Sequence, residues 1–242
     1  MIDTKTNLLD ALCEDLTLAH HLFAEFNWDD LTYTHLTARN PHRDSYFIMP
    51  FGQLFTEVKS HALLEIDFAG NVIGRVKEGY NPTGHVIHGS IYAARKDVNA
   101  IFHSHTPDNV AVSSQINGLL PISQWGLLFY ERFGFHDYDS LALHSDLQGN
   151  MIVKDLGEKP VLLMRNHGVV VAGGGIAETF YMHYHLEMAC KTQCKLLAMN
   201  QKYNLPDHEL SQRACKDLND FEIHNGQRDW QALKRKYGHL VR

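Results

Sequence analysis

Two histidines separated by a single residue, His103 and His105, follow an apolar run in the stretch AIFHSHTPDNV. In a β-strand, side chains two residues apart point to the same face of the sheet, so the two imidazoles would emerge side by side. Neutral imidazole is the commonest metal ligand in proteins, and a catalytic zinc site uses three protein ligands and keeps one position open. The spacing therefore predicts two of the three ligands of an open metal site.

A third candidate ligand is His167, which lies in KPVLLMRNHGVVVAGGG between two apolar, β-rich runs. Gly168 follows it, and a glycine at a strand end relieves backbone crowding and lets the neighbouring side chain turn into a cleft. A lone histidine is more often a satisfied core or surface residue than a ligand, and the paired histidines alone bring the two interpretations only to even weight. From these residues alone, a metal site is one of two hypotheses.

The elements that would position these histidines follow from the spacing of apolar residues and from turn residues. Helices are expected in five segments: residues 7–26, 81–97, 106–116 and 176–200, and an amphipathic tail from residue 207 that Trp230 anchors. Thr106 is the expected N-cap of the third helix, with Pro107 in its first turn. Strands are expected within residues 32–41, 45–50, 63–74 (a hairpin), 99–105 and 159–175. The order lacks a strict β-α-β rhythm, which predicts an α/β fold with a mostly antiparallel sheet.

Composition narrows the class of protein and its partners. The 242 residues carry a net charge of −6 and no long basic block, which argues against nucleic acid as a partner. We expect no membrane association, because no apolar run reaches the length of a membrane span and the N-terminal segment is acidic. The four cysteines form no C-x-x-C pair, so we expect reduced thiols and a cytoplasmic location. We expect residues 1–205 to form one domain and residues 206–242 a helical extension packed on it.

Two longer stretches, GHVIHGSIYAARKDVNAIFHSHTPDNVAVS and LLMRNHGVVVAGGGIAETFYMHYHLEMAC, resemble the class II aldolase/adducin family, and the likeness runs from about residue 8 to residue 199. The resemblance implies a three-layer α/β/α sandwich around an antiparallel-rich sheet, assembled as a homotetramer with sites near subunit interfaces. It also implies that His103, His105 and His167 bind a divalent metal, usually zinc, with Fe²⁺ or Mn²⁺ as alternatives.

The sequence departs from the family's aldolases at the turn NPTGHVIHGS. Gly84 stands where those enzymes have the glutamate that moves the proton, and Pro82 and Thr83 stand where they have phosphate-binding serines. His35 stands where they have an asparagine of the phosphate loop. The turn instead resembles the adducin-like branch, which lacks the glutamate, and this weakens the case for a phosphorylated sugar as substrate.

Several neighbouring side chains are candidates to complete the site. The expected substrate-binding residues are Asn81, Thr83, Gly84 and His35, and Gly84 is expected to hold a positive φ that disfavours a side chain. His88 lies one helical turn after Gly84 and is the candidate acid/base residue or fourth ligand, with the adjacent His85 as an alternative. The competing interpretation is that His88 only braces its helix.

Four other residues have weaker claims. Tyr130 and Glu131 could line a cleft, although an aromatic residue in an apolar run is more often part of the core. On the long helix, Glu178 is expected to be a first-turn charge that the helix dipole favours, and Glu187 a solvated or packing residue.

Two functions from different classes fit these observations. The first is a metal-dependent lyase that acts on a small hydroxy-carbonyl or carboxylate compound, or a related decarboxylase, in which the metal acts as a Lewis acid that stabilises the enediolate left by carbon–carbon cleavage. The second is an adducin-like binding or scaffolding module with an altered site. The three candidate ligands favour the enzyme, and the missing glutamate favours the module.

Overall fold

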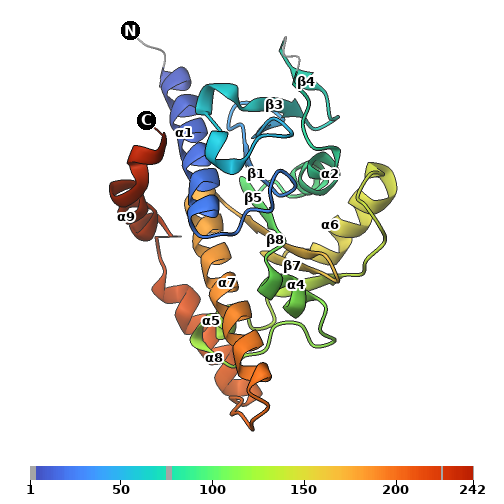
Figure 1. The fold of residues 1–242 in the computed structure, drawn as a ribbon, viewed down its shortest axis with the longest axis vertical. Coiled ribbons are helices and arrows are strands. Elements are labelled where there is room, and N and C mark those ends of the chain that lie inside the picture. Colours follow the sequence, from blue (N-terminus) through green and yellow to red (C-terminus); the bar gives the residue numbers. More distant parts are fainter. Residues whose placement is uncertain (1–3, 75–77, 225, 242) are drawn as a thin grey trace.

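One mixed sheet forms the centre of the computed structural model, which describes residues 4–74, 78–224 and 226–241 (Figure 1). The strand order is β4-β3-β2-β1-β5-β8-β7-β6, and every neighbouring pair is antiparallel except β6 and β7. The strands are β1 (His35–Arg39), β2 (Ser45–Ile48), β3 (Leu64–Asp67), β4 (Val72–Ile73), β5 (Ala100–Ser104), β6 (Phe133–His136), β7 (Val161–Met164) and β8 (Gly168–Gly173). The mostly antiparallel sheet predicted from the sequence is confirmed.

Helices cover both faces of this sheet (Figure 1). The α-helices are α1 (Thr4–Glu25), α2 (Pro82–Gly84), α3 (Ser90–Ala94), α4 (Pro107–Ser113), α5 (Gln124–Leu127), α6 (Asn150–Leu156), α7 (Ile176–Ala198), α8 (His208–Phe221) and α9 (Gln227–Tyr237). The 3₁₀ and π turns are η1 (Phe55–Glu57), η2 (Ser60–Ala62), η3 (His85–Gly89), η4 (Ser145–Gly149) and η5 (Gly238–Val241). Together with the sheet they form the expected three layers.

The alternation of side chains in the central strands divides the core between the two faces. Phe102 of β5 packs with residues of α1 and α7 on one face, whereas its neighbour Ile101 packs with residues of α3 and α6 on the other. His103 therefore shares the α3 face with Ile101, and Ser104 shares the α7 face with Phe102. This division places the two sides of the His-Ser-His segment in different environments.

The helix that follows β5 begins as the sequence predicts. The side chain of Thr106 accepts a hydrogen bond from the backbone N–H of Asn109, and Pro107 occupies the first turn, where its missing N–H has no structural cost. At the start of α7, Glu178 accepts a hydrogen bond from the backbone N–H of Gly174 at 2.6 Å, as expected for a first-turn acid.

The helix expected over residues 81–97 forms from Pro82 to Ala94, and its middle is a π-helical turn, η3, rather than a regular α-helical turn. A π turn holds one more residue than an α turn and so shifts the phase of the side chains that follow, and such turns occur often at functional sites. His88 lies in this turn and is fully buried.

The C-terminal helices pack against the rest of the chain. Trp230 of α9 is buried in the cluster that contains residues of α1, its ring lies 5.4 Å from that of Phe180, and its indole N–H donates to Asp15. Trp230 is thus the apolar anchor that the sequence predicts. Among the residues described, none of the helices combines the length and the apolar character that a membrane crossing requires.

Candidate metal centre

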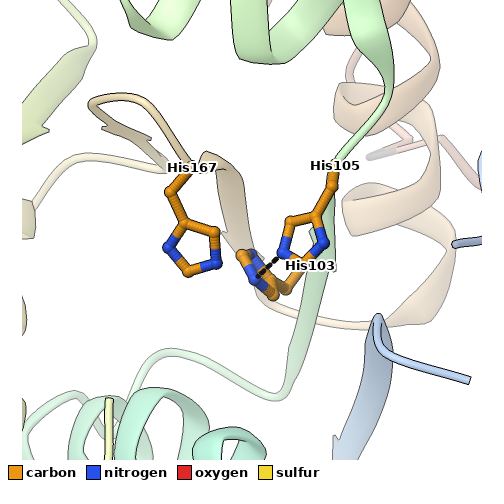
Figure 2. Close-up of side chains that lie close together, drawn as sticks. All are labelled: His103, His105 and His167. Carbon is orange, nitrogen blue, oxygen red and sulfur yellow. Dashed lines mark hydrogen bonds between the residues drawn. The ribbon is translucent and has the colours of Figure 1, made fainter. Parts of the chain in front are cut away.

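Three imidazoles converge at the end of β5 (Figure 2). His103 comes from the strand itself, His105 follows the strand, and His167 comes from the connection between β7 and β8. One nitrogen from each ring lies within 4.8 Å of the others, and the ring centroids are 4.5–4.9 Å apart. The structure therefore brings together the three candidate ligands that the sequence identifies.

The Asn-His-Gly motif positions His167 through its two neighbours. Asn166 has φ 59°, in the left-handed region that asparagine tolerates better than most residues. A Cβ on Gly168 would lie 2.3 Å from the carbonyl oxygen of Ser104, so only glycine allows β8 to approach β5 this closely. The turn and the close approach together direct the imidazole of His167 toward the other two.

Hydrogen bonds fix which nitrogen of each paired histidine carries its proton. The Nδ1 atom of His103 donates to the carbonyl oxygen of Val169 at 2.9 Å, and Nδ1 of His105 donates to the Asp30 carboxylate at 3.1 Å. In the neutral rings both Nε2 atoms then carry a lone pair, yet they lie 2.7 Å apart. Two facing lone pairs repel each other unless a cation lies between them, so this donor set fits a metal ion.

Burial keeps these imidazoles in the neutral form that a metal requires. Burial and the neighbouring histidines hold the pKa of His103 well below its usual value. Burial also lowers the pKa of His105, against the opposing effect of Asp30, and lowers that of His167 to about 4. The site is therefore poised to bind a cation rather than protons at neutral pH.

A hydrogen-bonded chain of buried side chains leads away from the three histidines. The His35 ring lies 4.9 Å from the ring of His103, its register partner on β5. Nδ1 of His35 bonds to Nε2 of His88 at 2.9 Å, and Nδ1 of His88 bonds to the hydroxyl of Thr37 at 2.7 Å. The Thr37 hydroxyl also bonds to that of Tyr92 at 2.9 Å. His35 thus lies between His88 and the candidate ligands, and both nitrogens of His88 are occupied.

The other candidates in the NPTG turn shape the wall behind His35. Asn81 caps α2, where its side chain accepts hydrogen bonds from the backbone N–H and the hydroxyl of Thr83. Gly84 has φ −60°, so the expectation of a positive φ there is wrong. Its Cβ would instead meet the His35 ring at 3.3 Å and Ile48 at 3.1 Å, which shows that close packing is what favours glycine. His85 lies beside Gly70 in the turn between β3 and β4, and its Nδ1 bonds to the hydroxyl of Tyr46 on β2.

Three further candidates, Tyr130, Glu131 and Glu187, are not among the residues whose side chains converge on the site. Tyr130 and Glu131 line an open cleft beside α8, and Tyr130 bonds to His208. Glu187 was expected to be either a solvated or a packing residue, and it is buried, so it packs. Burial raises the pKa of Glu187 to about 7. The contacts of Glu187 with Ser104 of β5 and Asn109 of α4 were not expected from the sequence.

One cleft lies beside the candidate ligand His167, whereas a larger cavity lies away from all three candidate ligands. A small cleft borders His167 and is also lined by His136, Asp139 and Arg165. A larger cavity of about 610 Å³ lies between α7 and α9, with Phe26 and Phe221 also in its lining. This lining contains none of the three candidate ligands. The chemistry of the donor set, not the size of the cavity, therefore identifies the site.

Comparisons with known proteins agree with this geometry. A family model described as the Class II Aldolase and Adducin N-terminal domain matches residues 14–194. A relative from Caulobacter vibrioides named "Putative aldolase class 2 protein" is 37% identical over 188 residues, which are 77% of this chain and 73% of that protein. Alpha-adducin of Rattus norvegicus is 39% identical over 177 residues, which are 72% of this chain but 24% of that protein.

Solved structures extend the likeness to the whole fold. An aldolase II superfamily protein from Pseudomonas syringae superimposes with a TM-score of 0.87 at 34% identity, covering 95% of this chain and 93% of that one. The L-fuculose 1-phosphate aldolase from Glaciozyma antarctica PI12 superimposes with a TM-score of 0.86 at 25% identity, covering 100% and 96% of the two chains. The C-terminal helices are therefore included in the structural match.

Proposed function

Because the chain belongs to the class II aldolase and adducin family, we propose that it is a divalent-metal-dependent lyase acting on a small hydroxy-carbonyl or carboxylate compound. The observation that carries this proposal is the pair of Nε2 atoms of His103 and His105, which face each other at 2.7 Å while both Nδ1 protons are donated elsewhere. His167 completes a set of three nitrogen ligands.

Zn²⁺ is the proposed ion, because three histidines suit zinc and leave it an open position, with Fe²⁺ and Mn²⁺ as alternatives. The bound ion would supply a Lewis acid toward the oxygen atoms of the substrate. The protein contributes fixed orientation: Val169 and Asp30 hold the rings of His103 and His105 in the tautomer that leaves Nε2 free for the ion.

We assign proton transfer at the reacting centre to His35 rather than to His88. The His35 ring lies against that of His103, and its Nδ1 is bonded to His88, so its Nε2 is the atom left for the substrate. His88 is fully buried and bonded to Thr37 through its second nitrogen, so it acts on the reaction only by orienting His35. Asn81, Thr83 and Gly84 hold the turn that packs behind His35 and form the proposed substrate wall.

The alternative function is an adducin-like binding or scaffolding module. Its support is the 39% identity to alpha-adducin together with Gly84, which stands where the aldolases of the family have a glutamate. A module needs no open metal position and no catalytic turnover. An enzyme needs both, so metal content and turnover discriminate between the two functions.

Metal analysis of purified protein tests the lyase proposal first. Elemental analysis of protein prepared without chelator should find close to one equivalent of zinc, iron or manganese per chain. The His103→Ala, His105→Ala double variant should lose it, and undiminished metal in that variant would reject the assignment. A screen of hydroxy-carbonyl and carboxylate compounds for cleavage follows, in which His35→Ala should lose more turnover than His88→Ala.

We further propose a cytoplasmic homotetramer, since members of this family often form oligomers with sites near subunit interfaces. Light scattering at micromolar protein concentration tests the oligomeric state. A monomer with the chain mass of 27.6 kDa would reject this part of the proposal without affecting the metal centre.

A further inference from the structure

Ser104 lies between the two paired ligands and contacts the segment that carries the third. It is the last residue of β5, and its register partner on β8 is Val169. Its carbonyl oxygen lies where a Cβ on Gly168 would be only 2.3 Å away. A shift of Ser104 would therefore move all three imidazoles relative to one another.

The side chain of Ser104 points away from the imidazoles into a buried polar cluster beneath them. Its hydroxyl bonds to Nε2 of His183 at 2.7 Å and accepts from the side-chain amide of Asn109 at 2.9 Å. His183 and Glu187 come from α7, and Asn109 comes from α4. Ser104, His183 and Asn109 are fully buried, and Glu187 is 5% exposed.

Glu187 accepts hydrogen bonds from both sides of this cluster. The amide of Asn109 donates to its Oε1 at 2.7 Å, and the hydroxyl of Thr106 donates to its Oε2 at 2.7 Å. The Ser104 hydroxyl lies 3.5 Å from Oε1. Ser104 and Thr106 are the two residues that flank His105, so one carboxylate holds the backbone on either side of a ligand.

The remaining protons of the cluster support the same arrangement. Among the residues that the structure describes, Nδ1 of His183 has no hydrogen-bond partner. An unpaired lone pair there costs less than an unpaired N–H, so the proton belongs on Nε2 and is donated to Ser104. Ser104 then accepts from both His183 and Asn109, and its own proton points to Glu187. The carboxylate is thus the acceptor at which the network ends.

A buried carboxylate lowers stability relative to apolar packing, so its presence calls for a role beyond the core. We infer that Glu187 is a positioning residue for the metal centre, which sets the spacing of the ligand nitrogens through Ser104 and Thr106 without contacting the ion. This inference rests on the proposed metal site. It adds that the site needs Glu187, in addition to the three ligands, to hold the ligand nitrogens at the right spacing.

Cobalt binding to purified variants of the 242-residue chain tests whether Glu187 positions the metal ligands. Stripped wild-type, Glu187→Leu and Glu187→Gln proteins are titrated with Co²⁺ in competition with a chromophoric chelator, and the visible spectrum of the bound ion is recorded. Removing an outer partner of a metal site typically weakens affinity by about 10- to 100-fold. We expect a loss of that size with an altered cobalt spectrum for Glu187→Leu and a smaller loss for Glu187→Gln, which keeps one acceptor oxygen.

Gln193→Leu is the matched control, because Gln193 is also a fully buried polar residue of α7. Its side chain bonds to Leu120, Gly118 and Gln115, none of which belongs to the ligand segment. Urea unfolding of the metal-free variants shows whether both substitutions lower stability. We expect the control to bind Co²⁺ within about twofold of wild type with an unchanged spectrum.

Two results would overturn the inference while leaving the metal centre intact: wild-type cobalt affinity and spectrum in both Glu187 variants, or an equal loss of affinity in Gln193→Leu. Wild-type protein that binds no Co²⁺ would instead overturn the metal centre and this inference with it. If Glu187→Leu does not fold, the affinity and spectrum of Glu187→Gln decide between these outcomes.

Discussion

Nδ1 of His105 lies 3.1 Å from Oδ2 of Asp30, a residue 75 positions earlier in the chain. The carboxylate can only accept, so it holds the His105 proton on Nδ1 and leaves Nε2 free to bind a cation. Carboxylate–histidine pairs of this kind orient metal ligands and raise their basicity. Asp30 therefore belongs to the proposed metal centre although it would not touch the ion.

We expect Asp30→Asn to weaken metal affinity by about 10- to 100-fold, because the amide neither carries the charge nor reliably accepts the His105 proton. Stability of the metal-free protein should change little, since the Asp30 side chain is 46% exposed. Chelator competition measures the affinity, and urea unfolding measures the stability. Asp29→Asn is the control, and equal affinities in the two variants would show that Asp30 does not support the site.

The approach of β8 to β5 gives a prediction at Gly168. A Cβ there would meet a backbone oxygen at 2.3 Å, which cannot move aside as a flexible side chain would. We expect Gly168→Ala to lower the free energy of unfolding by about 1–3 kcal/mol and to weaken metal binding, because β8 and His167 must shift.

Gly175→Ala provides the comparison for this substitution. A Cβ on Gly175 would meet no atom of the described part of the chain within 4 Å, and the φ of 173° at Gly175 is ordinary extended backbone. Urea unfolding should therefore show little change for Gly175→Ala. Equal stability of the two variants would mean that the β5–β8 contact tolerates a side chain.

Local sequence predicts the parts of the site whose geometry is itself local. Strand alternation and a strand-end glycine were enough to bring His103, His105 and His167 into one hypothesis, and the capping pattern correctly started α4 at Thr106. The expected three-layer fold came from the family resemblance, and the structure confirms it.

Long-range partners could not be predicted in the same way. Asp30 and Glu187 are joined to the ligand segment by contacts across 75 to 83 positions, and local sequence patterns do not predict contacts of that range. The pair His183 and Glu187, four residues apart among apolar neighbours on one helix, was the available signal of a buried polar cluster. The π turn η3 explains why His88 turns to Thr37 rather than toward the ligands, since helical spacing alone assumes a regular turn.

His20 gives a pH prediction that does not involve the metal centre. It is fully buried against Phe55, and burial lowers its pKa from 6.5 to about 4. Below pH 6.5 the unfolded chain binds a proton that the folded chain refuses, so this contribution to stability is complete above pH 6.5 and is lost as the pH falls toward 4. The loss amounts to about 1.4 kcal/mol per pH unit.

Urea unfolding of metal-free protein between pH 7 and pH 4.5 measures this dependence. Other buried histidines add to the slope of the wild-type protein, so the difference between variants isolates His20. We expect His20→Leu to reduce the slope by about 1.4 kcal/mol per pH unit, whereas substitution of the exposed His42 by Gln should leave it unchanged. Parallel slopes for wild type and His20→Leu would show that His20 is protonated in the folded state.

The substitution Gly84→Glu tests what separates this protein from the sugar-phosphate aldolases it resembles. General acid–base help is worth about 10²- to 10⁴-fold in rate, and the proposed proton-transfer residue, His35, does not stand where those aldolases have their glutamate. The native protein should therefore show little cleavage of fuculose- or rhamnulose-type phosphates. The backbone at Gly84 has φ −60° and accepts a side chain without strain, but a Cβ would press on His35 at 3.3 Å and on Ile48 at 3.1 Å. We therefore expect a folded variant in which the His35–His88 pair is disturbed.

Pro82 and Thr83 still stand where those aldolases have serines, so the Gly84→Glu variant would hold the substrate phosphate poorly and its rescue of cleavage should be weak at most. Cleavage of both phosphates is measured for native and variant protein at saturating zinc. Robust turnover by the native protein would mean that another residue, with His35 as the first candidate, already serves as the base for these substrates.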